Sequence, residues 1–419
     1  MDAPSLTRGQ QHTSQPRHIC VVTETYPPEI NGVASTLAHL VDGLLAQGHA
    51  VSVVRLHQQP VERHGDRHNL QLTLVRGLPL PGYKGLHVGL PAGGVLRGCW
   101  TQPRPDVVYV ATEGPLGWSA VRTAQHLGIP VFSGFHTNFH SYSGHYRASW
   151  LEPVIFRYLR RFHNRTSGTL VPSLDLCDQL RAIGLKNVSV LGRGVDHQLY
   201  TPARRCAALR RSWGVSHTDL VVLYVGRLAP EKNLGLAIEA FRAMRRLSHA
   251  TRFVLVGDGP LRTALQKDHA DLVFCGAHTG EQLARHYASA DVFLFPSETE
   301  TFGNVTLEAM ASGLVVVAYD YAAARMHITP GKTGVLVPYG EAAAFVDAAV
   351  RLARTPQLLD EMRRQARAYA AALDWPGVVQ RFATLLTGAL DQSQTTSTVS
   401  SPRRRWPRRR KRLRNSGRI

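Results

Sequence analysis

The chain has 419 residues, of which 44% are hydrophobic, and its formal net charge is +19. Because this length exceeds one ordinary domain, we expect two to three globular units, each large enough to bury its own core. No apolar run approaches the ~18 residues of a membrane-spanning helix, and residues 1–17 lack the apolar stretch of a signal peptide. These features predict a soluble protein, or one that attaches to a membrane only at its surface.

The five cysteines are scattered along the chain and include no C-x-x-C pair. Such spacing is typical of reduced, mostly buried thiols rather than of a disulfide framework. We therefore expect a cytoplasmic protein.

The first elements form a strand–loop–helix–strand unit. A strand over residues 18–23 is followed by a loop over 24–32, a helix over 33–47 and a strand over 50–56. The leucines and valine of the helix lie on one face, which is the period of an amphipathic helix. The same order recurs with a strand at 107–111, a helix at 120–127 and a strand at 130–135, and this repetition is typical of a parallel sheet covered by helices on both faces.

A second series of strands and helices begins near residue 218. Its predicted strands are 220–226, 251–257, 272–276, 292–296 and 315–319. Its predicted helices are 233–247, 261–267, 280–289 and 304–312, with further helices to about residue 390. We therefore predict an α/β protein with two Rossmann-like doubly wound domains that face each other across a cleft, over residues 18–200 and 201–374. A helix at 375–390 follows, while residues 1–17 and the Ser/Thr-rich and basic segment 391–419 are expected to be disordered.

Ligands of doubly wound sheets bind beyond the carboxyl ends of the strands, and the segment 296–311, PSETETFGNVTLEAMA, begins at such an end. Glu300 precedes the predicted helix and Glu308 lies within it. Eight helical residues would span ~12 Å, which is too wide for the carboxyl pair of a retaining glycosidase and better suits two ends of one extended ligand. A cap residue and an exposed helix glutamate would give the same pattern. The free backbone N–H groups expected to form an anion site belong to Thr301, Phe302, Gly303 and Asn304.

A second polar segment, VLYVGRLAPEKN at 222–233, places Arg227 and Lys232 on a short turn after a strand. Two cations at this position suit a diphosphate, with arginine as a fork and lysine as a point charge. Solvent-exposed loop charges are the alternative.

Two further segments belong to the first half of the chain. Asn31-Gly32 forms a tight turn into the helix at 33, where the amides of Gly32 and Val33 would contact a phosphate, although a plain capping turn fits equally well. His136 directly follows a strand in FHTNFHSYSGHY (135–146) and would hydrogen-bond a sugar beside Tyr142 and Tyr146. A zinc site with His140 and His145 is the weaker reading, since no H-E-x-x-H motif or cysteine partner accompanies them.

The C-terminal segment from Arg403 to Arg418 contains nine arginines and one lysine without an acid. A solvated, disordered extension explains such a run, and so does attraction to acidic lipid, to which each basic residue contributes ~1 kcal/mol. Trp406 lies inside the run and would suit a headgroup interface. Because no nucleic-acid recognition motif is present, we do not expect a specific nucleic-acid partner.

Together these segments resemble the family 4 glycosyltransferases of the GT-B fold. The resemblance covers about residues 18–390. It rests on the E-x7-E pair Glu300 and Glu308, the GR…EKN segment, the first glycine loop, His136, and the blocks GRGVD (192–196), VGDGP (256–260) and ADVFLFPS (290–297). More narrowly, ATEGPLG (111–117) and GFHTNFHSY (134–142) resemble bacterial GDP-mannose-dependent α-mannosyltransferases.

The resemblance implies a retaining, metal-independent transferase without a cofactor. Glu308 would hold the nucleotide ribose, while Glu300 and the amides of Phe302, Gly303 and Asn304 would hold the donor sugar. Arg227 and Lys232 would stabilise the leaving diphosphate, Gly32 would contact the phosphates, and His136 would bond the sugar. The last helix would cross back onto the first domain.

The expected donor is a GDP-sugar, GDP-mannose by preference, or a UDP-sugar, and the expected acceptor is lipid-linked or a glycan. The expected location is the cytoplasm, with attachment to the inner face of the plasma membrane through the basic tail. A UDP-sugar-dependent glycolipid synthase, a non-transferring GT-B enzyme such as an epimerase, and a nucleic-acid-binding protein acting through the tail are the alternatives.

Overall fold

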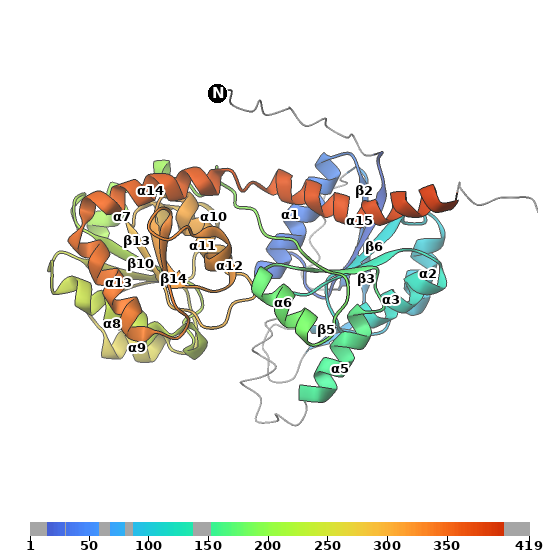
Figure 1. The fold of residues 1–419 in the computed structure, drawn as a ribbon, viewed down its shortest axis with the longest axis horizontal. Coiled ribbons are helices and arrows are strands. Elements are labelled where there is room, and N and C mark those ends of the chain that lie inside the picture. The colour runs from blue at the N-terminus through green and yellow to red at the C-terminus, as the bar shows by residue number, and fades with distance from the viewer. Residues whose placement is uncertain (1–14, 30, 58–67, 80–86, 137–151, 398–419) are drawn as a thin grey trace, which may run out of the picture.

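The computed structural model describes residues 15–29, 31–57, 68–79, 87–136 and 152–397. The predictions for residues 1–14, for the tail 398–419, and for His140, Tyr142, His145 and Tyr146 concern residues outside these ranges. The described chain forms two lobes, each with a parallel sheet covered by helices (Figure 1). The expected α/β class with two Rossmann-like domains is confirmed.

The first lobe contains a seven-stranded parallel sheet in the order β3-β2-β1-β6-β7-β8-β9. Every residue of β6, VVYV, is buried, as expected for a parallel strand that is covered on both faces. Its strands are β1 (His18–Val22), β2 (Ala50–Leu56), β3 (Leu70–Val75), β6 (Val107–Val110), β7 (Val131–Gly134), β8 (Gly168–Val171) and β9 (Val188–Val190). Its helices are α1 (Gly32–Ala46), α2 (Gly93–Thr101), α3 (Pro115–His126), α5 (Glu152–His163) and α6 (Leu174–Ala182), and the short strands β4 (Gly77–Pro79) and β5 (His87–Gly89) form a separate antiparallel pair.

The second lobe contains a six-stranded parallel sheet in the order β12-β11-β10-β13-β14-β15. In chain order this is the 3-2-1-4-5-6 arrangement of a dinucleotide-binding fold, whose direction reverses between β10 and β13. The strands are β10 (Val221–Val225), β11 (Arg252–Val256), β12 (Val273–Gly276), β13 (Val292–Phe295), β14 (Val315–Tyr319) and β15 (Gly334–Val337). The helices are α7 (Ala207–Ser212), α8 (Leu234–Arg245), α9 (Arg262–Asp268), α10 (Gly280–Ala288), α11 (Asn304–Ala311), α12 (Ala322–His327), α13 (Ala342–Arg354) and α14 (Pro356–Ala371), with 3-10 turns at Pro202–Arg204 and Pro230–Lys232.

Two expectations for the C-terminal part of the chain are corrected. Only helices were predicted after the strand at 315–319, whereas β15 pairs in parallel with β14 and completes the sheet. The last helix, α15 (Trp375–Ser397), also runs past residue 390 into the segment expected to be disordered.

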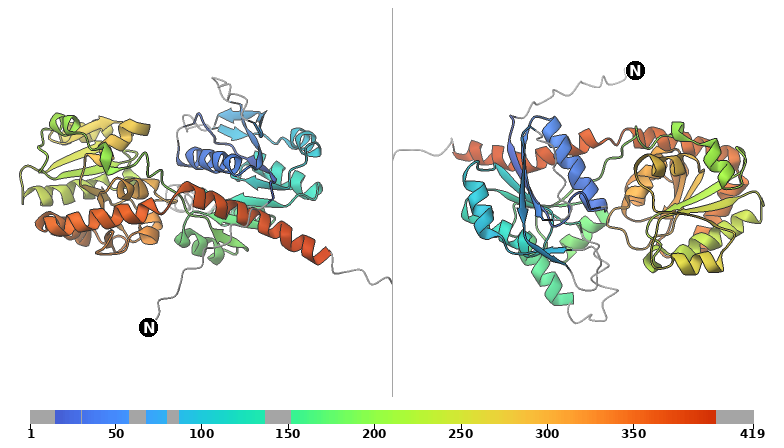
Figure 2. Two further views of the ribbon diagram at one scale, coloured as in Figure 1. Left: turned by 90° about the horizontal axis from the view of Figure 1, so that it is seen from above. Right: turned by 180° about the vertical axis from the view of Figure 1, so that it is seen from behind.

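Helix α15 leaves the second lobe at the end of α14 and lies along the first lobe beside α1 (Figures 1 and 2). Its apolar side chains Val379, Phe382 and Leu386 are buried in the core that α1 shares with the first sheet. Contact is close, since a Cβ on Gly43 of α1 would lie 2.4 Å from a methyl carbon of Val379. The last helix of the described chain thus packs on the first lobe.

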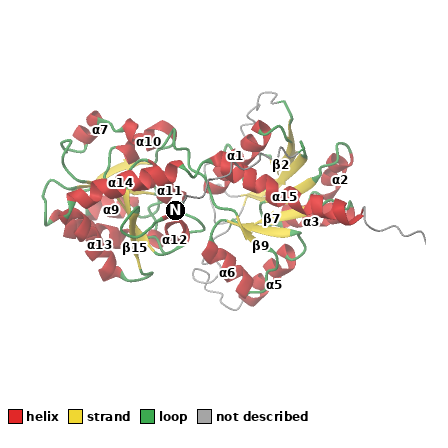
Figure 3. Cartoon of the chain, turned by 45° about the horizontal axis from the view of Figure 1, so that its top comes forward, coloured by secondary structure: helices red, strands yellow, loops and turns green. Residues whose placement is uncertain are grey.

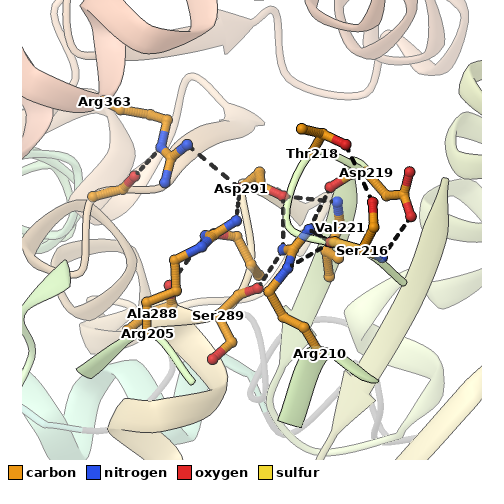
Figure 4. A network of polar contacts seen from close by, with 12 residues as sticks. Arg205, Arg210, Ser216, Thr218, Asp219, Val221, Ala288, Ser289, Asp291 and Arg363 are labelled. Atoms are coloured by element: carbon orange, nitrogen blue, oxygen red, sulfur yellow. Dashed lines mark hydrogen bonds and ion pairs between the residues drawn. The ribbon is translucent and has the colours of Figure 1, made fainter. Parts of the chain in front are cut away.

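A network of charges fastens the linker and two helices to the amino end of the second sheet (Figure 4). Asp291, just before β13, pairs with Arg205 at 2.9 Å, Arg210 at 3.3 Å and Arg363 at 3.4 Å, and also accepts the N–H of Val221. These arginines belong to the linker, α7 and α14. At the opposite, carboxyl end of the sheet, the loops that follow β10 and β13 line a pocket together with residues of the first lobe, in the region of the green loops between the lobes in Figure 3.

Among the described residues, no helix has both the length and the apolar character needed to cross a membrane.

Candidate active site

A cavity of about 520 Å³ lies between the two lobes, at the carboxyl ends of their strands. From the first lobe it is lined by Thr25, Asn31, Gly32, Val33, His136 and Arg193. From the second it is lined by Val225, Gly226, Arg227, Lys232, Phe295, Glu300, Thr301, Phe302, Gly303, Asn304 and Val305. The second-lobe wall follows β10 and β13, which flank the point where strand order reverses and where such sheets bind ligands. Eight of the nine residues to which the family resemblance assigned a role therefore line one cavity, and Glu308 is the exception.

Glu300 and Lys232 form an ion pair on the second-lobe wall of the cavity. The same carboxylate oxygen of Glu300 accepts the hydroxyl of Ser297 at 2.8 Å, and the backbone carbonyl of Glu300 accepts the hydroxyl of Tyr321 at 2.9 Å. Both side chains are mostly buried, with 16% and 17% of their surface exposed. The pair thus has fixed geometry, and a ligand meets a lysine whose charge is already partly neutralised.

The loops that carry these two residues are joined by a second contact. Asn233, which ends the EKN segment in a left-handed conformation with φ 51°, donates to Glu298 at 3.1 Å. The loops after β10 and β13 are therefore held in one arrangement.

Arg227 is the exposed cation of the cavity. Its side chain is 67% exposed, and its nearest acid is Glu231 at 3.8 Å. A surface contact of this kind is weak, so the guanidinium is available to a ligand.

The start of α11 presents unsatisfied donors to the cavity. Gly303 precedes the helix with φ 94°, a conformation that favours glycine, and no side chain caps the helix. Within the described residues, the backbone N–H groups of Thr301, Phe302, Gly303 and Asn304 have no hydrogen-bond acceptor. This is the geometry of an anion site at a helix N-terminus.

The start of α1 faces the cavity from the first lobe, but most of its donors are taken. Asn31 caps this helix, and its side-chain oxygen accepts the N–H groups of Val33 at 3.1 Å and Ala34 at 2.8 Å. The suggested phosphate contact from the Val33 amide is therefore not available in this conformation. Gly32 lies on the cavity wall, and a Cβ built on it would lie 3.7 Å from the side-chain nitrogen of Asn304.

Glu308 does not line the cavity. Its carboxylate accepts the hydroxyl of Tyr287 at 2.9 Å and a second hydrogen bond from Tyr200. Burial raises the pKa of Glu308 to about 7, although both tyrosine hydrogen bonds favour the ionised form. The two glutamates of the E-x7-E pair thus have separate partners within the protein.

His136 uses both ring nitrogens within the protein. Nδ1 lies 3.0 Å from Nη2 of Arg193, and Nε2 lies 2.9 Å from the hydroxyl of Tyr109. Burial and the Arg193 charge hold the pKa of His136 well below its usual value, so the ring is neutral. The expected hydrogen bond from His136 to a sugar would require one of these bonds to break.

The described residues contain no group of three or more histidine, cysteine, aspartate or glutamate side chains that is arranged to hold a metal. The five cysteines are all free thiols.

Two family models match the chain. Residues 30–199 match Glycosyltransferase Family 4, and residues 219–355 match Glycosyl transferases group 1. A GDP-mannose-dependent alpha-mannosyltransferase of Mycobacterium tuberculosis is 35% identical over 77% of this chain and 84% of that protein. The chain belongs to glycosyltransferase family 4. It is therefore a glycosyltransferase, as the sequence motifs predicted.

Other proteins are similar to the chain over most of its length. The sulfoquinovosyl transferase SQD2 of Arabidopsis thaliana is 31% identical over 90% of this chain and 74% of that protein. The crystal structure of HepE from Anabaena in complex with UDP superimposes with a TM-score of 0.71, at 19% identity, covering 88% of this chain and 100% of that one. Its likeness supports the two-domain GT-B architecture.

Three residues of this glycosyltransferase site escaped the sequence reading. Arg193 lies in the GRGVD block, which was used only as a family marker, and Tyr200 and Tyr287 carry no local motif. For Arg193 a signal existed: it follows a strand that ends at the same sheet edge as His136. For the tyrosines no signal existed, because Tyr287 meets Glu308 through the packing of α10 against α11 and Tyr200 reaches it from the segment before the 3-10 turn at Pro202–Arg204.

Proposed function

We propose that this glycosyltransferase transfers mannose from GDP-mannose to a lipid-linked or glycan acceptor, with retention of the anomeric configuration and without a metal. The observation that carries the proposal is the interdomain cavity, in which an N-terminal helix end, the Lys232–Glu300 pair and Arg227 surround one space. The mannose donor rests on the similarity to the GDP-mannose-dependent alpha-mannosyltransferase of Mycobacterium tuberculosis.

Each side chain has a proposed part in binding. Arg227 and Lys232 bind the donor diphosphate, and the free amides at the start of α11 bind the donor sugar together with Glu300. Glu308 binds the ribose after its carboxylate turns from the tyrosines. Gly32 allows the phosphates to approach the first lobe, and closure of the two domains excludes water.

The proposed reaction breaks the bond between the anomeric carbon and the diphosphate oxygen. Its electron pair passes to the leaving nucleoside diphosphate, whose growing negative charge Arg227 and Lys232 stabilise. An acceptor hydroxyl oxygen bonds to the anomeric carbon on the face that the diphosphate leaves, and its proton passes to a departing phosphate oxygen. Because Glu300 is held by Lys232 and Ser297, we assign it to sugar binding and charge stabilisation rather than to a covalent intermediate.

A UDP-sugar-dependent glycolipid synthase is the second candidate. The observation that favours it is the likeness to HepE, which was crystallised with UDP. The proposed contacts in the cavity bind the diphosphate and the sugar of the donor. They would therefore be the same for a guanine and for a uracil nucleotide. A non-transferring enzyme of the same fold is a weaker alternative, since the curated relatives reported above are transferases.

We further propose that the protein works in the cytoplasm at the inner face of the plasma membrane. The described part of the chain has a basic face in addition to the tail. Arg157, Arg160 and Arg161 of α5 and Arg165 just after it line one hollow, and Arg122 lines a second hollow together with Arg161 and Arg165. Val154 and Tyr158 of α5 are 61% and 42% exposed, so the same helix offers apolar side chains. Such a combination suits an acidic lipid surface.

The experiment is a panel of GDP- and UDP-sugars, assayed in the presence of EDTA with diacylglycerol-based and glycan acceptors. Nuclear magnetic resonance of the product identifies the anomer. An α-mannoside formed from GDP-mannose supports the proposal, and α-transfer from a UDP-sugar alone supports the second candidate. Inversion of the anomeric configuration or dependence on a divalent metal would contradict the proposal.

A further inference from the structure

Arg193 is a buried arginine on the wall of the cavity, located where the chain passes between the lobes. It follows β9 in the segment 192–196, and its residue surface is 6% exposed. The next residue, Gly194, packs against the backbone that leads into α15: a Cβ there would lie 2.7 Å from the nitrogen of Trp375. Val195 also donates its N–H to the carbonyl of Leu373 at 2.9 Å. The backbone on both sides of the domain crossing thus fixes where the guanidinium lies.

The guanidinium has no acidic partner among the described residues. Within the described part of the chain, Nη2 of Arg193 donates a hydrogen bond of 3.0 Å to Nδ1 of His136. Burial lowers the pKa of Arg193 to about 10, so it remains a cation at neutral pH. Buried charges are normally paired, because a charge removed from water without a counter-ion is strongly unfavourable. An unpaired buried cation that faces a cavity therefore suggests an anion that is bound during function.

The contact with His136 has a defined direction. Arginine can only donate, so Nδ1 of His136 accepts and Nε2 carries the proton. Nε2–H then donates to the hydroxyl of Tyr109, which is fully buried. This chain of bonds fixes the imidazole as a neutral acceptor and turns one edge of the guanidinium toward it, which leaves the other N–H groups for a ligand.

The charges that line the cavity show what kind of ligand fits. Three cations, Arg193, Arg227 and Lys232, face one carboxylate, Glu300. Without Arg193, the charged side chains that line the cavity would have a net charge of +1, from Arg227, Lys232 and Glu300. The diphosphate of a sugar nucleotide carries two negative charges, and it gains a third when it leaves the sugar. Arg193 supplies the missing positive charge from the lobe opposite to Arg227 and Lys232.

We propose that Arg193 binds an oxyanion of the substrate, and that His136 is the residue that positions it. The inference rests on the proposed function. A phosphate of the donor is the source favoured by the charges. An acidic group on the acceptor or on the transferred sugar has the same chemistry, and the experiment distinguishes the two.

The test compares Arg193→Gln and Arg193→Lys with the wild type, with Arg246→Gln as a matched control because Arg246 is exposed and lies outside the cavity. Titration calorimetry with GDP, UDP and inorganic pyrophosphate, without an acceptor, measures the donor arm. If the donor phosphate is the ligand, Arg193→Gln weakens nucleotide binding about tenfold or more, as expected for a lost charged hydrogen bond. Arg193→Lys is intermediate, and Arg246→Gln binds like the wild type.

The second arm uses one acceptor glycolipid as the free carboxylic acid and as its methyl ester. If the acceptor supplies the anion, Arg193→Gln leaves nucleotide binding unchanged and raises KM for the acid form alone by about tenfold. A sugar nucleotide with an acidic transferred sugar, compared with its neutral counterpart, tests the remaining source in the same way. Unchanged nucleotide affinity together with unchanged KM for all these substrates would overturn the proposal.

Chemical rescue distinguishes a role of Arg193 in ligand binding from a role in maintaining the fold. In Arg193→Ala, guanidinium chloride at a non-denaturing concentration is expected to restore nucleotide affinity or KM, whereas a fold defect would show a lowered Tm and no rescue. His136→Gln, which retains an acceptor for the guanidinium, should bind ligand better than His136→Ala. If wild-type protein bound neither nucleotide, the proposed function would fail; a binding-competent protein that is indifferent to Arg193→Gln would refute this inference alone.

Discussion

Lys232 and Glu300 form an ion pair across the point where the strand order of the second sheet reverses. They lie 68 positions apart in the chain and meet because β10 and β13 are neighbours in the sheet. The pair joins the two loops that form the donor-side wall of the cavity.

Substitution of either partner should impair transfer. Glu300→Gln and Lys232→Gln are each expected to lower kcat/KM by about 10²–10³, the usual cost of removing one charged group that stabilises a transition state. Since the two residues act as a unit, the double variant should lose less than the product of the single losses. Steady-state kinetics measures these losses, with Glu281→Gln as the control because Glu281 is an exposed glutamate on α10. If the loss in the double variant equalled the product of the two single losses, the two residues would act independently.

Gly32 is expected to tolerate a methyl group but not a long side chain. A Cβ at this position would make an ordinary contact of 3.7 Å with Asn304, so Gly32→Ala should keep donor KM within about twofold of the wild type. Gly32→Leu would extend into the space between the lobes and should raise donor KM by about tenfold or more. Equal effects of the two substitutions would contradict the assignment of Gly32 to the cavity wall.

Donor binding should weaken as pH falls below about 7. The pKa of Glu308 is raised by burial to about 7, so protonation on the acid side removes an acceptor that the ribose hydroxyls would use. The donor KM is expected to rise from pH 8 to pH 6, and Glu308→Gln should flatten that part of the profile.

Tyr287 provides a finer check on the same carboxyl group. Tyr287→Phe removes a hydrogen bond that favours the ionised carboxylate, so the midpoint of the pH profile should move to higher pH. A midpoint that stays unchanged, or that moves to lower pH, would mean that another group controls donor binding.

The docking of α15 should depend on the absence of a side chain at Gly43. Gly43→Ala places a methyl group 2.4 Å from a methyl carbon of Val379, and the overlap should destabilise the fold by about 1–3 kcal/mol despite the better helix propensity of alanine. Val379→Ala in the same chain should recover part of that loss. Chemical denaturation measures both, and additive effects of the two substitutions would contradict direct packing.

The basic face on α5 should contribute to binding of acidic vesicles. Replacing Arg157, Arg160 and Arg161 with glutamine should weaken sedimentation with phosphatidylglycerol vesicles by roughly one hundredfold, at ~1 kcal/mol for each charge. The matched control replaces Arg351, Arg354 and Arg364, which are exposed on α13 and α14. Equal losses of vesicle binding in both triple variants would show that net charge, rather than this face, controls binding. Deletion of residues 403–419 measures how much the tail contributes to the same binding.

The regular elements were predictable because their patterns are local. Continuous apolar runs such as VVLYV gave the buried parallel strands, and the leucine spacing of 33–47 gave α1 to within one residue at its start. The strand β15 was missed because it has four residues, GVLV, behind a glycine-containing turn, and so short a run is ambiguous without its partner β14.

Site residues were predictable where a motif lies at a strand end. They were not predictable where their hydrogen-bond partners come from distant parts of the chain. Lys232, Glu300 and Gly303 followed from this rule. The capping of Val33 by Asn31 was a foreseeable alternative, because asparagine is a preferred cap. The partners of Glu308 and His136 come from other elements, and only the packed structure brings them together.

The most direct test of the cavity as the donor site is the affinity of GDP for the wild type and for the double variant Arg227→Gln/Lys232→Gln, measured by titration calorimetry. We predict measurable binding to the wild type and at least a roughly hundredfold loss in the double variant, about tenfold for each charged contact. Equal affinities, or no GDP or UDP binding to either protein, would contradict the assignment of this cavity to a nucleotide sugar.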